Sequence, residues 1–523
     1  TMRYRAYIKS LSGLCRSAGG LFLTLALLLG GCATHLEPRP LPESLSLPPD
    51  PASVAWQPLR DNLPGGARTS WFHVQDIGPE ALRWRLAMID TAMTTLDAQY
   101  FIWKDDAVGS LLLERLLQAA DRGVRVRLLL DDSFLSGVDD LMLAVDAHPQ
   151  VEMRIFNPFE MRSDSMALRY IENLNDNARI NHRMHNKLLI ADSEVAIIGG
   201  RNIADEYFGF DREMNFRTFD VLTTGIVLPQ VSASFDSYWN SGWAWPVTVV
   251  DRQQGRPEDL DRLRVSLRGN AAVLDTWLAG ADVARETLPA RWAGLARRLL
   301  PGVAQLQQDD PHIVAGLPVQ AASHAVGYLR RAREDVMSIS AYLIPSDTVL
   351  QIAGEQTQQG VRIRALTNSL ASNNHIPAHT AYRHRRRQIV DVGVELHELR
   401  PDASGRTAFE APGFTAEQVG LHAKLLVLDR RYSFVGTINA DPRSMILNTE
   451  VSMLIDSPQV AERILEAFAA DFLPQNSWRV RLNDDGSLRW HSANGVLEQQ
   501  PAGGTLRRMA DFFFGLLPID EQM

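Results

Sequence analysis

Two distant segments of this chain carry the same set of side chains that can act on a phosphodiester. Both follow the pattern H-x-K-x4-D-x6-G-[GT]-x-N, and each position of the second lies 237 residues after its counterpart in the first. The first set is His185, Lys187, Asp192, Gly199, Gly200 and Asn202, and the second is His422, Lys424, Asp429, Gly436, Thr437 and Asn439. A single His-x-Lys is weak evidence, whereas a repeat of this length at one fixed offset is hard to obtain by chance.

The residue types indicate what such a pair of sets could do. An imidazole can attack phosphorus or protonate a leaving oxygen, and a lysine with an asparagine can hold the nonbridging oxygens. Two sets facing each other therefore supply one nucleophile and one general acid for a two-step displacement. The sequence has no obvious carboxylate cluster for magnesium and no Cys/His zinc pattern, so we expect neither a metal nor another cofactor.

Strands must present these side chains. His185 and Lys187 alternate to the same face of an extended segment and so point the same way. Short β-branched runs at 123–130 and 360–366 each follow a helix-like stretch. Strands that alternate with helices predict an α/β fold. The glycines that end each motif either bring backbone amides to the phosphate or form plain turns, and we favour the phosphate site.

The chain resembles the phospholipase D superfamily, whose members carry paired HKD motifs of this form. Segments outside the motifs, at 99–103, 123–127 and 367–370, resemble the bacterial cardiolipin synthase C-type branch, and the likeness covers about residues 75–520. The resemblance implies two phospholipase D-like α/β lobes, each a mixed sheet flanked by helices. It further implies a pseudo-twofold arrangement with the active site at the lobe interface. In that site His185 would be the nucleophile and His422 the general acid.

The resemblance also implies one acidic residue in each half that hydrogen-bonds a catalytic imidazole and sets its tautomer. We assign this role to Asp220 and Glu450, which stand in similar strand-like stretches. Asp220 lies 18 residues after Asn202 and Glu450 lies 11 after Asn439, which indicates an insertion in the first half. Glu213 is the alternative to Asp220, and two surface acids are the remaining reading.

The N-terminus predicts export and lipid attachment. Basic residues precede an apolar run at 21–29 that is short for a transmembrane helix, and the Leu-Gly-Gly-Cys sequence ending at Cys32 resembles a bacterial lipobox. We expect a lipoprotein signal peptide at 1–31, then a lipidated Cys32 and a proline-rich tether at 32–69. Ordinary signal cleavage and an uncleaved anchor are the alternatives. The alanine after Cys32 favours the outer over the inner membrane, on the periplasmic side of a bacterial envelope.

The rest of the chain divides by composition. We expect lobe one at 70–250, a helical connector at 251–310, lobe two at 311–480 and a C-terminal tail at 481–523. A net charge of −9 over 523 residues argues against a nucleic-acid partner, because such binding rests on a cationic surface.

Two features allow two readings each. The basic run that includes His379, Tyr382 and Arg383 could hold an anionic headgroup or form a solvated helix face. The aromatic segment 512–518 could insert at a membrane interface or pack onto the body of the protein.

We therefore expect a phosphatidyltransferase that makes cardiolipin from phosphatidylglycerol and a second phospholipid through a covalent phosphohistidine. Phosphatidylethanolamine is the candidate second lipid, and the membrane is reached through the lipid anchor. Hydrolysis of phospholipid headgroups is the alternative, because it shares every catalytic residue and differs only in the acceptor. A nucleic-acid phosphodiesterase and a non-catalytic envelope protein are less favoured, the latter because both motifs are intact.

Overall fold

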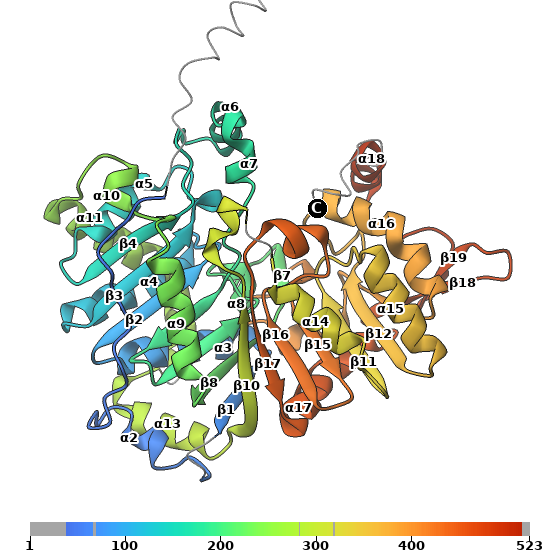
Figure 1. The fold of residues 1–523 in the computed structure, drawn as a ribbon, viewed down its shortest axis with the longest axis horizontal. Coiled ribbons are helices and arrows are strands. Elements are labelled where there is room, and N and C mark those ends of the chain that lie inside the picture. Colours follow the sequence, from blue (N-terminus) through green and yellow to red (C-terminus); the bar gives the residue numbers. More distant parts are fainter. Residues whose placement is uncertain (1–37, 66–68, 282, 317–318, 515–523) are drawn as a thin grey trace, which may run out of the picture.

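The computed structural model describes residues 38–65, 69–281, 283–316 and 319–514, which form two α/β lobes side by side (Figure 1). In the described residues, 18 strands from both lobes belong to one mixed sheet, and two further strands form a separate small sheet. The expected fold class is confirmed. The signal peptide and Cys32 lie outside the described residues. Among the helices of the described part, none combines the length and apolar composition needed to cross a bilayer.

Lobe one contains a sheet with a parallel and an antiparallel half. Strands β4, β3 and β2 are parallel, and β5, β6, β8 and β1 follow β2 with antiparallel pairing, while β9 lies at the outer edge. The strands are β1 (Ser70–Gln75), β2 (Thr95–Tyr100), β3 (Arg125–Asp131), β4 (Val151–Phe156), β5 (Leu188–Ala191), β6 (Val195–Gly199), β8 (Asp220–Gly225) and β9 (Ala244–Pro246). Strand β5 is apolar throughout because both of its faces are buried.

Lobe two repeats this arrangement. Strands β13, β12 and β11 are parallel, β15, β16 and β17 follow with antiparallel pairing, and β18, β19 and β20 extend the sheet beyond β13. The strands are β11 (Asp335–Ser340), β12 (Arg362–Asn368), β13 (Glu395–Leu399), β15 (Lys424–Leu428), β16 (Tyr432–Gly436), β17 (Val451–Asp456), β18 (Ser477–Leu482), β19 (Leu488–Ser492) and β20 (Gly495–Leu497). The order of strands around the motif is therefore the same in both lobes.

Helices cover both faces of the sheet. The helices of lobe one are α2 (Gln57–Arg60), α3 (Gly78–Thr91), α4 (Ala107–Asp121), α5 (Asp139–Asp146), α6 (Met166–Glu172), α7 (Asn177–Ile180), α8 (Asp205–Phe208), α9 (Leu228–Trp239) and α10 (Val247–Val250). Those of lobe two are α14 (Ala321–Leu329), α15 (Asp347–Gln358), α16 (Ile376–Asp391), α17 (Pro458–Ala469) and α18 (Thr505–Phe514). Helices α9 and α17 share one hydrophobic core that contains buried residues of both lobes, so the two halves are packed together.

The connector differs from the expected bridge of helices. Its helices α11 (Pro257–Ala271), α12 (Asp275–Gly280) and α13 (Leu288–Ala296) pack against lobe one, where Trp292 is fully buried. The lobes are joined by the strand that follows, β10 (Leu300–Gln308). Its first residues pair with β1 and the rest pair with β17. One extended strand thereby makes the two sheets continuous.

The segment expected as a free tether is held on lobe one from residue 38 onward. The amide of Arg39 donates to the carbonyl of Gly242 at 2.9 Å, and the amide of Ser46 donates to Asp236. Trp56 is fully buried, with its ring centroid 5.0 Å from that of Trp292. The prolines do keep the backbone extended, but polar contacts and one large aromatic side chain attach it to the body.

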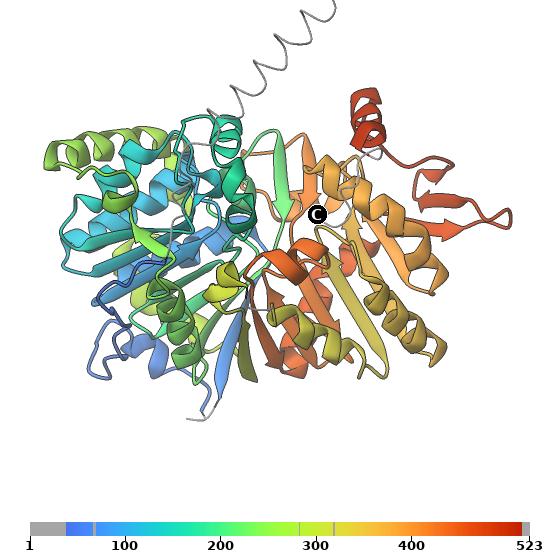
Figure 2. The same cartoon turned by 45° about the horizontal axis from the view of Figure 1, so that its top comes forward.

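Two short helices expose apolar side chains on the same side of the molecule. Helix α6 of lobe one and helix α18 of lobe two both stand out at the top in Figures 1 and 2. Around α6 the exposed side chains include Leu168, Ile171 and Leu174, and on α18 they include Leu506, Met509, Phe512 and Phe513. The inner face of α18 packs on α16, so the tail is partly docked and partly exposed.

Candidate active site

Each motif histidine is held through backbone bonds to the other lobe. The amide of His185 donates to the carbonyl of Thr449 at 2.9 Å, and the amide of His422 donates to the carbonyl of Arg217 at 2.8 Å. Arg217 ends β7 (Met214–Arg217), which pairs in parallel with β14 (Gln418–Leu421) directly before His422. These crossed contacts bring the two motifs together at the lobe interface.

His185 is oriented by a carboxylate from lobe two. Its Nδ1 lies 2.9 and 3.1 Å from the two carboxylate oxygens of Glu450. Because this contact occupies Nδ1, Nε2 is the ring nitrogen left for chemistry. The ring of Phe101 stands edge-on at 5.0 Å, and the amine of Lys187 lies 5.2 Å from the same phenyl ring. The imidazole is thus fixed in both tautomer and plane.

His422 has a different environment. The rings of Tyr207 and Phe216 lie 5.0 and 5.5 Å from its imidazole, and both come from lobe one. The amine of Lys424 donates to the His422 carbonyl at 2.8 Å and lies 3.1 Å from its Nδ1. No carboxylate contact to this ring is found among the described residues. The two histidines are therefore chemically unequal.

Burial and mutual repulsion shape the charges of the site. Burial lowers the pKa of both histidines, and the charges of Lys187 and Lys424 lower it further in each case. Burial also lowers the pKa of Lys187 to about 7 and raises the pKa of Glu450 to about 7. Each lysine acts on the histidines of both lobes, so these groups share one electrostatic environment. Crowded amines of this kind favour an incoming phosphate anion.

The motif asparagines and glycines lie at the same end of the sheet. The side-chain oxygen of Asn202 accepts from the amide of Ile102 at 3.2 Å, and the amide of Asn439 donates to Ser444. A Cβ at Gly199 or Gly436 would fall within 2.5 Å of the neighbouring strand. The amides of Gly200 and Thr437 donate to strand carbonyls at 2.9 Å. Close strand pairing, rather than phosphate approach, therefore accounts for these two glycines.

The motif aspartates do not join the histidines. Asp192 and Asp429 follow β5 and β15 at the end opposite to the catalytic groups. Asp192 accepts from the amides of residues 93–95, each at 2.8 Å, and from the indole of Trp56. Asp429 accepts from the amides of residues 333–335. The expectation of a catalytic role is corrected to a structural one, since both carboxylates fix the turn before the adjacent strand.

The expected role of Asp220 also needs correction. Strand pairing aligns Gly199 with Asp220 but Gly436 with Ser452, so the counterpart of Glu450 in lobe one is Thr218. The carboxylate of Asp220 instead accepts from Arg85 at 2.8 Å and from Arg201 at 3.0 Å. These guanidinium groups lower the pKa of Asp220 against the opposing effect of burial. Asp220 is thus the centre of a buried ion cluster.

The proposed headgroup residues lie in lobe two and are already engaged. His379 contacts Gln500 at 3.3 Å, the hydroxyl of Tyr382 donates to Glu398 at 2.8 Å, and Arg383 pairs with Asp511 at 3.0 Å. These contacts hold α18 and β13 against α16. The basic run is therefore not a fully solvated helix face, because its inward side chains join elements of the fold, and headgroup binding stays a prediction.

The aromatic residues around the histidines were not singled out as site residues from the sequence. Phe101 lies in the segment 99–103 that resembles the family, and this was the available signal for it. Tyr207 and Phe216 are separated from His422 by more than 200 residues, and only the folded lobe brings them together. Within the described residues there is no cluster of His, Cys, Asp or Glu that could hold a metal ion.

The comparisons with known proteins agree with this geometry. The family model described as "Cardiolipin synthase, PLD-like domain" matches residues 86–239 and 326–472, once in each lobe. The chain belongs to this family. It is 35% identical over 461 residues to Cardiolipin synthase C of Escherichia coli, which covers 84% of this chain and 93% of that protein.

More distant family members and a solved structure extend the likeness. A Cardiolipin synthase of Clostridium perfringens is 24% identical over 390 residues, covering 73% of this chain and 66% of that protein. The crystal structure of phosphatidylserine synthase from Haemophilus influenzae covers 90% of this chain and all of its own, with a TM-score of 0.55. Because its sequence identity is 13%, it supports the fold alone.

Proposed function

We propose that this protein makes cardiolipin by moving a phosphatidyl group from one phospholipid to the hydroxyl of phosphatidylglycerol, with phosphatidylethanolamine as the candidate second lipid. The contact between His185 and Glu450 across the lobe interface carries the proposal, because it leaves one imidazole nitrogen available beside two buried lysines. The 35% identity to Cardiolipin synthase C supports the choice of lipid substrates.

The proposed reaction has two steps. Nε2 of His185 attacks phosphorus and forms a phosphohistidine, while His422, protonated when the phosphate anion is bound beside it, gives its proton to the departing alcohol. The hydroxyl of phosphatidylglycerol then gives its proton to His422 and attacks phosphorus, and the bond to His185 breaks. Lys187 and Lys424 stabilise charge on the nonbridging oxygens in both steps. No metal or organic cofactor is required.

Hydrolysis is the second candidate, since water could replace the alcohol in the second step with the same residues. A nucleic-acid substrate is not favoured, because a net charge of −9 opposes binding to a polyanion.

The proposed location is the periplasmic side of a bacterial envelope, with Cys32 lipidated and the outer membrane favoured over the inner. The exposed apolar side chains of α6 and α18 support close contact with a bilayer, because both helices stand on one side of the molecule. The chain runs from α6 through α7 directly to His185. This side is therefore the natural entry for lipid.

The test uses purified protein and labelled phosphatidylglycerol, with and without phosphatidylethanolamine, followed by lipid chromatography and mass spectrometry. Labelled cardiolipin is the expected product, whereas phosphatidic acid alone would establish the hydrolase. Intermediates trapped by rapid denaturation at mildly alkaline pH, where the P–N bond survives, should carry phosphohistidine at position 185. Label at 422 with none at 185 would reverse the two roles.

A further inference from the structure

The two lobes differ at one pair of equivalent places beside the catalytic groups. In each lobe a helix precedes the first parallel strand and covers the same face of the motif strands: α3 in lobe one and α14 in lobe two. In lobe one the space beneath this helix is filled by charged side chains. Arg85 of α3 and Arg201 both bond Asp220, and all three side chains are at most 2% exposed.

The corresponding positions of lobe two are small or apolar. The motif repeat places Ile438 at the position of Arg201, and strand pairing places Ser452 at the position of Asp220. Helix α14 has Ala322 and Ala325 facing the cavity, at the place where Arg85 of α3 lies in lobe one. The ion cluster of lobe one therefore has no counterpart here, and a cavity of about 110 Å³ takes its place.

This cavity is lined in part by motif residues of lobe two. Lys424, Gly436 and Asn439 are among the residues that line it. Most of the remaining lining is apolar and comes from α14, β15, β16 and the turn after the motif, including Val326, Leu329, Phe434 and Met445. A cavity that combines these motif side chains with an apolar lining matches a molecule that joins a phosphate to a hydrocarbon.

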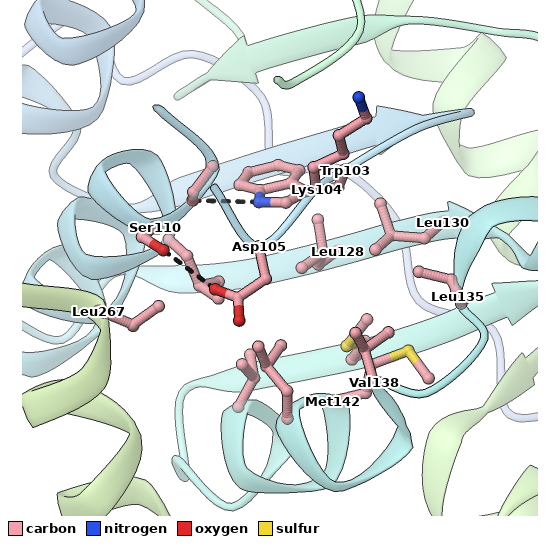
Figure 3. Close-up of a pocket in the computed structure, with 15 residues that line it drawn as sticks. Trp103, Lys104, Asp105, Ser110, Leu128, Leu130, Leu135, Val138, Met142 and Leu267 are labelled. Carbon is pink, nitrogen blue, oxygen red and sulfur yellow. Dashed lines mark hydrogen bonds between the residues drawn. The ribbon is translucent and has the colours of Figure 1, made fainter. Parts of the chain in front are cut away.

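A second cavity differs from this one in both its size and its lining. Between β3, α4 and α5 of lobe one lies an apolar cavity of about 30 Å³ (Figure 3). In Figure 3 the indole of Trp103 bonds the carbonyl of Gly109, and Asp105 bonds Ser110. No motif residue lines this cavity, and its volume is about that of one water molecule. It is a packing gap within a core.

We propose that the cavity beneath α14 binds the first methylene groups of an acyl chain on the phospholipid whose phosphate lies at Lys424 and Asn439. The proposal rests on the proposed function and names the part of the substrate that this cavity binds. A cavity of about 150 Å³ can hold benzene, so about 110 Å³ accommodates a short apolar segment and leaves the rest of the chain outside. Because lobe one has a buried ion cluster where lobe two has this cavity, the acyl chain is assigned to lobe two.

The test fills the cavity and varies the chain length. Ala325→Phe and Val349→Phe introduce bulk from two different helices that line the cavity, and Val349 lies on α15. His324→Phe is the matched control, because His324 is an exposed neighbour on α14 that does not line the cavity. The substrates are phosphatidylglycerols with butanoyl, hexanoyl and octanoyl chains, and bis(p-nitrophenyl) phosphate serves as the diester without a chain.

In the wild type and in His324→Phe, KM should fall with chain length by about fourfold for each methylene that enters the cavity. In both cavity variants this dependence should be lost, which raises KM for hexanoyl lipid by about ten- to a hundredfold. Hydrolysis of bis(p-nitrophenyl) phosphate should stay at the wild-type rate. Two variants are used because Ala325→Phe alone could displace Lys424, which loss of activity on the chainless diester would reveal.

The proposal would be overturned if Val349→Phe kept the wild-type dependence of KM on acyl-chain length. It would also be overturned if the cavity variants raised KM for the acceptor glycerol headgroup while their selectivity for chain length was unchanged. Failure of the proposed function has a separate signature. In that case the wild-type protein turns over the chainless diester but no phospholipid of any chain length.

Discussion

Replacing Glu450 by glutamine tests the cross-lobe contact most directly. The amide has nearly the shape of the carboxylate but no charge, and its nitrogen can donate to Nδ1 of His185. A donor at that position favours the tautomer that carries its proton on Nε2, which cannot attack phosphorus. The variant should therefore lose catalysis while its fold remains intact.

The expected loss follows from the geometry. In serine proteases, replacing the buried carboxylate behind the catalytic histidine by its amide lowers kcat by about 10⁴. Glu450 is fully buried and 2.9 Å from Nδ1, which is a comparable arrangement. We expect a fall of about 10³ in kcat, or about 4 kcal/mol of transition-state stabilisation, with little change in KM. Burial raises the pKa of Glu450, so ionising it costs stability at neutral pH, and the glutamine variant should not melt earlier.

Steady-state kinetics on hexanoyl phosphatidylglycerol and a thermal melt give the required measurements. Thr218→Val is the matched control, because Thr218 occupies the equivalent position in lobe one and its buried hydroxyl oxygen has no hydrogen-bond partner. This control should keep nearly wild-type kcat. The reasoning is refuted if Glu450→Gln keeps more than about a tenth of wild-type kcat, or if Thr218→Val loses as much.

Four further outcomes are expected. Because burial lowers the pKa of Lys187 to about 7, the free enzyme loses this charge as pH rises through 7, so KM should rise above pH 7; Lys187→Arg, which stays charged, should flatten that rise. Asp220→Asn leaves the charges of Arg85 and Arg201 without their carboxylate and should lower the free energy of unfolding by about 3–5 kcal/mol, measured by urea denaturation. Activity should survive EDTA, and loss restored by one divalent ion would contradict the metal-free mechanism. Replacing Phe512 and Phe513 by serine should weaken sedimentation with lipid vesicles while activity on the chainless diester persists.

The sequence was sufficient for the fold class, and it singled out the two histidine and lysine pairs that the structure brings together, because both leave a repeated pattern in the chain. It also singled out Glu450, whose carboxylate contacts His185, but it was not sufficient for the equivalent position in lobe one. The first half has an excursion through β7 before β8, so counting from Asn202 cannot reveal which residue faces Gly199. Only strand pairing assigns Thr218 rather than Asp220 to the position of Glu450.

Burial was the other property that composition could not convey. A run of arginines on a helix has the same composition whether it faces water or buried acids, and Arg386 is buried with Glu398 at 2.7 Å. The prolines after residue 38 likewise predicted an extended chain correctly but gave no sign that it lies against lobe one. Trp56 was the residue that carried this information, since a large indole rarely stays in solvent.

The crossed backbone contacts determine when the site can assemble during synthesis of the chain. Lobe one is synthesised first and contains His185, but the carbonyl that holds this histidine and the carboxylate that orients it belong to residues 449 and 450. Throughout most of its synthesis the nascent chain therefore has the proposed nucleophile without the groups that orient it. On the proposed mechanism the site is complete only when the residues just before β17 are in place, so we expect a truncated product to be inactive on lipids.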